Sequence, residues 1–166
     1  MSTLIGKMAP DFKLEAGDGK VVTMADFAGK NVVLYFYPKD MTPGCTTEAC
    51  DFRESHQSFA ELDTIIVGVS PDPKERHEKF IAKYDLPFLL LSDPEHVLSE
   101  AYGVWVLKKN FGKEYMGVER STFVINKEGE VVKEWRKVKV KGHVEEALTY
   151  IKENLSLRQS EGRGRR

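Results

Sequence analysis

The residues best suited to chemistry are the two cysteines of the chain, and both lie in the segment 37–50. Cys45 follows a Thr-Pro-Gly turn, which itself follows the apolar run Val32–Tyr37. This order predicts a buried strand, a short loop and a helix that has Cys45 in its first turn. A helix start has unpaired N–H groups and a partial positive charge, and both favour thiolate over thiol. The pattern therefore predicts a cysteine that acts as a reagent.

The second cysteine, Cys50, lies five residues further along the same expected helix. Positions five apart on an α-helix have Cα atoms roughly 8–9 Å apart. A disulfide requires Cα atoms within about 7 Å of each other. The spacing therefore leaves two alternatives open. Either Cys50 is an inert helix residue, or the first turns unwind so that Cys50 can condense with an oxidised Cys45.

Ionisation alone does not make a thiol react rapidly. A thiol of ordinary pKa, about 8.5, is a few per cent ionised at neutral pH, so full ionisation raises its reaction rate only about 30-fold. Hydrogen-bond donors and a fixed cation are also needed. Thr42 offers a hydroxyl three residues before Cys45, and the backbone N–H groups of the helix start can bind an anion. Pro38 stiffens the loop and helps to exclude water. For the cation we select Arg120, which directly precedes a strand-like apolar run.

Size and composition indicate an ordinary globular enzyme. The chain has 166 residues, of which 41% are hydrophobic, enough for one domain with a core. Its 25 basic and 26 acidic side chains nearly balance, which argues against a nucleic-acid or membrane partner. The first residues lack the apolar stretch of a signal peptide, so a cytoplasmic location is expected. A zinc site that used both cysteines would lack further ligands, since His56 is the only histidine nearby.

Strand-like and helix-like segments alternate along the chain. Strands are expected within 10–23, as two short pieces around a turn, and at 32–37, 64–70, 88–91, 121–126 and 131–135. Helices are expected at 43–62, 74–84, 96–102 and 144–155. This order predicts an α/β fold with a central mixed sheet flanked by helices and an N-terminal hairpin extension, in a single domain over 1–155. We expect residues 104–119 to be a polar connection and residues 156–166 to be a disordered basic tail.

The remaining histidines, Glu48 and the basic pair at 108–109 are not expected to take part in catalysis directly. We expect His77 and His96 at the surface, and His143 as a cap of the final helix. Glu48, between the cysteines, could tune the site, but an exposed helical glutamate is the expectation. The basic pair at 108–109 is expected to be solvated, although it could steer an acidic reductant.

The pattern Pro38-x-x-x-Thr42-x-x-Cys45 resembles the peroxiredoxin active-site motif. The longer runs resemble one subfamily, peroxiredoxin Q or bacterioferritin comigratory protein, and they lie at residues 9–12, 36–46, 91–93, 102–105 and 112–125. The resemblance covers nearly everything from residue 5 to residue 155. It is therefore far more specific than a bare pair of cysteines.

The resemblance implies a thioredoxin-like fold and a thiol-dependent peroxidase without metal or organic cofactor. By it, Cys45 matches the peroxidatic cysteine, and Thr42, Pro38 and Arg120 match the residues that position and activate the hydroperoxide. Cys50 matches the resolving cysteine of members that form an intramolecular disulfide with the peroxidatic cysteine. The implied reductant is thioredoxin or a similar dithiol protein, and the implied assembly is a monomer or weak homodimer.

Two other functions stay open from the residues alone. A general dithiol–disulfide oxidoreductase usually carries Cys-x-x-Cys, whereas four residues separate the cysteines here, which counts against it. A redox-switched holdase would use the melting of the helix to expose Phe52 and Phe59.

Overall fold

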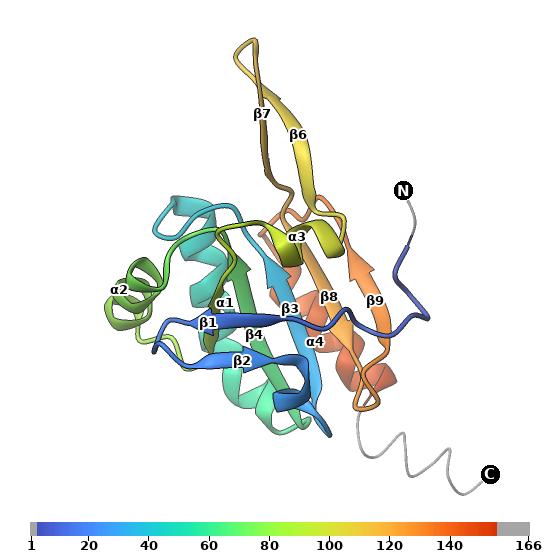
Figure 1. Ribbon diagram of the computed structural model, residues 1–166. Coiled ribbons are helices and arrows are strands. Elements are labelled where there is room, and N and C mark those ends of the chain that lie inside the picture. The colour runs from blue at the N-terminus through green and yellow to red at the C-terminus, as the bar shows by residue number, and fades with distance from the viewer. Residues whose placement is uncertain (1–2, 156–166) are drawn as a thin grey trace, which may run out of the picture.

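The computed structural model describes residues 3–155, which build a seven-stranded sheet with a hydrophobic core on each face (Figure 1). The strands lie in the order β2-β1-β5-β4-β3-β8-β9. Their bounds are β1 Lys13–Ala16, β2 Val21–Thr23, β3 Asn31–Phe36, β4 Thr64–Ser70, β5 Leu89–Ser92, β8 Ser121–Ile125 and β9 Val131–Trp135. The β3–β4 and β4–β5 pairs are parallel and the other pairs are antiparallel, so the predicted mixed sheet with an N-terminal hairpin is confirmed.

Strand β3 lies inside the sheet, between β4 and β8, and is buried along its whole length, which explains why its sequence is a continuous apolar run. Successive side chains of a strand point to opposite faces of the sheet. Val33 and Tyr35 therefore enter one core, while Val32 and Leu34 enter the other. The sequence prediction of a strand covered on both faces is confirmed.

Helices cover both faces of the sheet. The helical elements are the 3₁₀ turn η1 Met24–Phe27 and the α-helices α1 Pro43–Ala60, α2 Lys74–Tyr84, α3 Val97–Ala101 and α4 His143–Asn154. One core takes its side chains from α1, α2 and α4, and the other from η1, α3 and the N-terminal segment. Each predicted helix is present, and the bounds of α2 agree with the prediction. None of the helices within residues 3–155 has the length and apolar character needed to span a membrane.

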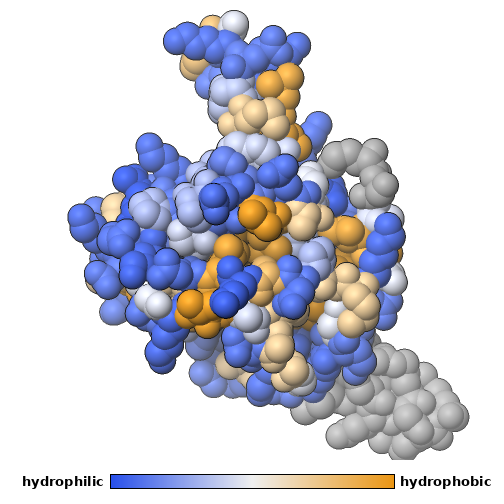
Figure 2. Space-filling model, in the orientation of Figure 1, coloured by the Kyte–Doolittle hydropathy of each residue, from blue (hydrophilic) through white to orange (hydrophobic). Residues whose placement is uncertain are grey.

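The prediction that residues 104–119 form only a connection was wrong. They form a two-stranded antiparallel hairpin, β6 Trp105–Asn110 and β7 Lys113–Val118, which projects from the body of the molecule (Figure 1). Its outer end is covered mainly by hydrophilic side chains (Figure 2). The turn at Phe111 and Gly112 has positive φ at both residues, 51° and 77°. Phenylalanine rarely adopts that conformation, so the sequence carries no clear turn signal there.

The tail predicted at residues 156–166 lies outside the described residues. That residues 1–155 form a single domain stays a prediction.

Candidate active site

Cys45 lies where the sequence places it, in the first turn of α1. Strand β3 ends at Phe36, a loop spans residues 37–42, and α1 begins at Pro43. The helix is established at its first turn, since the Thr46 N–H donates to the Thr42 carbonyl at 2.8 Å. The Cys45 side chain is almost completely buried. A buried sulfur at a helix N-terminus is shielded from bulk water and faces the positive end of the helix dipole.

The Arg120 guanidinium is the cation at the sulfur. Its Nη2 donates to Cys45 Sγ at 3.3 Å, and its Nη1 donates to Glu48 Oε1 at 2.6 Å. Burial opposes the charge, but Glu48 and the sulfur outweigh it and raise the pKa of Arg120. Gly44 leaves room for the guanidinium, because a Cβ at that position would lie 3.2 Å from Arg120 Nη2. The arrangement holds a charged donor directly against the sulfur.

Glu48 is a site residue, a role that the sequence left open, and the expectation that its side chain is exposed was wrong. Its side chain is completely buried, and its Oε2 has no hydrogen-bond partner among the described residues. Burial raises the pKa of Glu48 from 4.5 to about 7, although Arg120 acts in the opposite direction. The signal was present in the spacing, since Glu48 lies three residues after Cys45 and four before Phe52, on the buried face of α1.

The β6–β7 hairpin adds a second basic residue, Lys108 in the middle of β6, whose charge interacts with Arg120 and Cys45. Lys108 is half-buried, so its predicted role as a freely solvated charge was wrong. Burial lowers the pKa of Lys108, Arg120 lowers it further, and Cys45 is among the groups that oppose this. The stem of its side chain lies beside Gly117, where a Cβ would approach Lys108 Cδ to 3.2 Å. The hairpin therefore adds a basic side chain to the electrostatic surroundings of Arg120 and Cys45.

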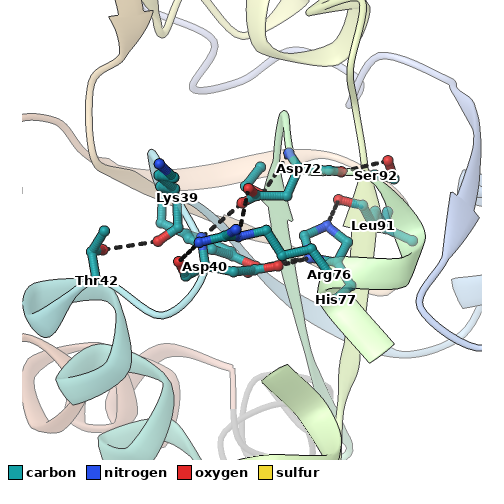
Figure 3. Close-up of polar contacts among 10 residues, drawn as sticks. Lys39, Asp40, Thr42, Asp72, Arg76, His77, Leu91 and Ser92 are labelled. Carbon is teal, nitrogen blue, oxygen red and sulfur yellow. Dashed lines mark hydrogen bonds and ion pairs between the residues drawn. The ribbon is translucent and has the colours of Figure 1, made fainter. Parts of the chain in front are cut away.

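Thr42 and Pro38 lie in the loop before α1. Thr42 is the N-cap residue of the helix, and its hydroxyl donates to the Lys39 carbonyl at 2.8 Å (Figure 3). Its Oγ1 can still accept a hydrogen bond from a bound molecule. Pro38 is half-buried in the same loop. The structure thus brings Arg120 into contact with Cys45 and leaves Thr42 and Pro38 in the adjoining loop.

Cys50 does not meet Cys45. Both thiols are free, and Cys50 is partly exposed on α1, which runs without interruption from Pro43 to Ala60. The intact helix separates the two sulfurs, as the spacing predicts.

The histidine expectations need correction. His77 is completely buried rather than at the surface, and its ring contacts Asp40 in the loop before α1. Together with Asp72 these residues form the one group within residues 3–155 that could supply three metal ligands.

Two further histidines also differ from expectation. His143 begins α4 but is also buried, with Nε2 2.8 Å from Thr122 Oγ1. His96 is half-buried, and its ring stacks on that of Trp105 with the ring centroids 3.5 Å apart.

Comparison with known proteins connects this site to one family. Residues 5–134 match the AhpC/TSA family. The chain is 66% identical over 153 residues to Peroxiredoxin Bcp of Bacillus subtilis, covering 92% of this chain and 98% of the relative. It is 44% identical over 142 residues to Peroxiredoxin Bcp of Xanthomonas campestris pv. campestris, covering 86% of this chain and 89% of the relative.

Solved structures agree. A structure of Xanthomonas campestris peroxiredoxin Q matches with a TM-score of 0.84 at 42% identity, over 87% of this chain and 92% of that one. A Xanthomonas campestris bacterioferritin comigratory protein, studied for alkyl peroxide reduction, matches with a TM-score of 0.84 at 41% identity and the same coverage. The family match includes α1 and Arg120. The chain therefore belongs to the AhpC/TSA family, and within it is a thioredoxin-fold peroxiredoxin of the peroxiredoxin Q, or bacterioferritin comigratory protein, subfamily, a thiol-dependent peroxidase.

Proposed function

We propose that Cys45 is the peroxidatic cysteine and reduces hydrogen peroxide and alkyl hydroperoxides. Its thiolate attacks the terminal peroxide oxygen, an S–O bond forms and the O–O bond breaks. The sulfur becomes sulfenic acid, and the other oxygen takes up a proton and leaves as water or an alcohol. The contact of Arg120 Nη2 with Cys45 Sγ at 3.3 Å carries this proposal, because it sets a charged donor where negative charge moves during the attack.

The neighbouring groups have separate roles. Arg120 stabilises both the thiolate and the charge that develops along the O–O bond. Glu48 fixes the guanidinium through the 2.6 Å ion pair. Thr42 accepts a hydrogen bond from the peroxide, and Pro38 keeps the loop stiff and limits water. No metal or organic cofactor takes part in this scheme.

Cys50 is the resolving cysteine in the same scheme. Its thiol attacks the Cys45 sulfenic acid, a disulfide forms and water leaves. Both cysteines lie on one continuous helix, so the first turns of α1 must open before the sulfurs can meet. The partial exposure of Cys50 supports this role, since an opened helix start could reach it from the solvent side.

A thiol reductant must complete the cycle, and we propose thioredoxin or a similar dithiol protein. Two electrons from the dithiol reduce the Cys45–Cys50 disulfide, and the reductant becomes the disulfide. A cytoplasmic location and a monomer or weak homodimer are parts of the same proposal. The two free thiols suit a reducing compartment.

Intact mass under denaturing, alkylating conditions tests the scheme after one equivalent of hydrogen peroxide is added to reduced protein. We expect a monomer that has lost two hydrogens and has no alkylatable thiol. The matched variant Cys50→Ser should instead gain one oxygen at Cys45. A wild-type protein that keeps both thiols would contradict the role of Cys45, and a disulfide-linked dimer would contradict the role of Cys50.

A further inference from the structure

A buried carboxyl–imidazole pair lies behind the catalytic loop, on the side of α2. Asp40 belongs to the loop and His77 to α2, and neither side chain is exposed. His77 Nδ1 lies 2.5 Å from Asp40 Oδ2, and Nε2 lies 2.9 Å from the Leu91 carbonyl oxygen of β5 (Figure 3). The imidazole therefore joins the loop, the helix and the sheet.

The geometry requires the pair to hold one proton between Nδ1 and Oδ2. A carbonyl oxygen only accepts hydrogen bonds, so Nε2 of His77 carries a hydrogen and donates to Leu91. A neutral imidazole has only that one hydrogen, which would leave a lone pair on Nδ1 facing a carboxylate oxygen. Two acceptors at 2.5 Å in a buried site repel each other, whereas one shared proton turns the contact into a strong hydrogen bond.

The remaining polar groups of Asp40 are bonded as well. Its Oδ1 accepts from the Tyr37 hydroxyl at 2.5 Å, and its backbone N–H donates to Asp72 Oδ2 at 2.7 Å. Its carbonyl accepts from Arg76 Nη2 at 3.1 Å. Burial, followed by the effect of Asp40, raises the pKa of Tyr37, which keeps the phenol protonated as a donor. Asp40 thus contacts Asp72, Arg76 and His77, and the Tyr37 hydroxyl adds a longer contact of 3.5 Å with His77 Nδ1.

The anchor is close to the reacting groups in the sequence. Asp40 lies two residues after Pro38 and two before Thr42, the N-cap of α1. The Thr42 hydroxyl is bonded to the carbonyl of Lys39, the residue directly before Asp40. A shift of Asp40 would therefore move Thr42 and the helix start that carries Cys45.

We propose that Asp40 and His77 are positioning residues for the peroxide step. Their shared hydrogen bond holds the catalytic loop, residues 37–42, against α2, and thereby fixes the positions of Thr42 and of the first turn of α1, which carries Cys45. This inference rests on the proposed role of Cys45. The Asp40–His77 hydrogen bond would hold the loop in place independently of the contact between Arg120 and the Cys45 sulfur.

The same side chains could be taken for a metal site, since one ligand atom each from Asp40, Asp72 and His77 lie within 4.8 Å of one another. Their atoms already have partners, however. Asp72 Oδ2 accepts from the Ser70 hydroxyl at 2.7 Å in addition to the Asp40 N–H, and Asp72 Oδ1 is paired with Arg76 Nε at 3.3 Å. These contacts favour a proton over a metal ion at the Asp40–His77 contact.

Two substitutions of Asp40 test the inference. Asp40→Asn can still accept from Tyr37 and can donate its amide N–H to the unprotonated Nδ1, so it keeps each side-chain hydrogen bond. Asp40→Ala removes them. We expect stopped-flow oxidation of Cys45 by hydrogen peroxide to be slowed at least about 10-fold in Asp40→Ala and to stay within about threefold of wild type in Asp40→Asn. Asp18→Ala, in the exposed β1–β2 turn, should have no effect.

A spectroscopic measurement detects the shared proton itself. In protein labelled with ¹⁵N-histidine, the wild type should show a strongly downfield proton on the His77 ring, and both Asp40 variants should lack it. Its absence from the wild type would overturn the proton assignment. Equal peroxide rates in wild type and Asp40→Ala would overturn the positioning role, and so would equal losses in the Ala and Asn variants.

A second pair of variants covers the case in which Asp40→Ala does not fold. An asparagine amide at position 77 can take the place of Nδ1 and bond Asp40, whereas a glutamine amide can take the place of Nε2 and bond Leu91. We expect His77→Asn to keep the peroxide rate within about threefold and His77→Gln to lose about 10-fold. The reverse order would refute the inference. If wild-type Cys45 itself fails to react with peroxide, the proposed function fails, which is a different result from any of these.

Discussion

Arg120 donates a hydrogen bond to the sulfur of Cys45 across 3.3 Å, although the two residues are 75 positions apart in the chain. The sheet explains this proximity. Strand β8 runs antiparallel to β3, and Ser121 at its start is paired with Phe36 at the end of β3. The residue before β8 and the helix after β3 therefore emerge at the same end of the sheet. The cation and the thiol come from opposite halves of the chain, yet one strand pairing brings both to the site.

Replacement of Arg120 should slow the peroxide step. Arg120→Ala removes the donor to Cys45 Sγ, and we expect the second-order rate constant with hydrogen peroxide to fall by about 10²-fold. Arg120→Lys keeps a charge but loses the planar fork that contacts Cys45 and Glu48 together, so an intermediate loss of about 10-fold is expected. Stopped-flow kinetics measures both values. An Arg120→Ala rate within a factor of two of wild type would remove Arg120 from the mechanism.

Gly44→Ala should separate stability from activity. Alanine is the better helix residue, so the free energy of unfolding should rise by about 0.4–1 kcal/mol. The new Cβ would lie 3.2 Å from Arg120 Nη2 and must push the guanidinium aside. We expect the peroxide rate to fall roughly threefold to tenfold while the melting temperature rises. An unchanged rate in the stabilised variant would mean that the guanidinium position is not critical.

Glu48 should make the stability of the protein fall as pH rises. Its pKa is about 7 in the fold against an ordinary 4.5, so between these values the folded state binds more protons than the unfolded chain. The loss of unfolding free energy caused by ionising the buried Glu48 is absent below about pH 4.5, grows between the two pKa values and is complete above about pH 7. Its size is on the order of 3 kcal/mol, since a difference of one in pKa corresponds to about 1.4 kcal/mol. Urea unfolding at a series of pH values measures it.

Glu48→Gln removes the titrating group and serves as the matched variant for that experiment. We expect its unfolding free energy to vary less with pH between about 5 and 7 than that of the wild type. The same slope in both proteins would show that Glu48 does not titrate in this range. The substitution also weakens the hold on Arg120, so a slower peroxide step should accompany the flatter profile.

The two serine variants should fail at different steps. Cys45→Ser should abolish peroxide consumption, because the reacting sulfur is gone. Cys50→Ser should oxidise once at close to the wild-type rate and then fail to turn over with thioredoxin and its reductase. Coupled NADPH oxidation reports turnover, and stopped-flow fluorescence reports the first oxidation. Normal thioredoxin-linked turnover in Cys50→Ser would exclude Cys50 as the resolving thiol.

Local patterns in the sequence were sufficient for most of the elements. The continuous apolar run at 32–37 identifies β3, since a strand covered on both faces has no polar side to show. The helical spacing of Cys45, Ala49, Phe52 and Phe59 identifies the buried face of α1. The turn before Cys45 and the helix after it are also local, so the place of the thiol at a helix start was predictable.

What the sequence could not decide depends on partners far along the chain. Glu48 and His77 look like surface residues because charged and titratable side chains are usually exposed. They are buried because Arg120 pairs with one and Asp40 with the other, 72 and 37 positions away. The β6–β7 hairpin was missed because its turn places Phe111 at positive φ. Local sequence patterns were enough to locate the thiol, its helix start and the order of the elements. Which buried charges meet depends on the folded arrangement of distant segments, because the burial of a charge is stable only beside its partner.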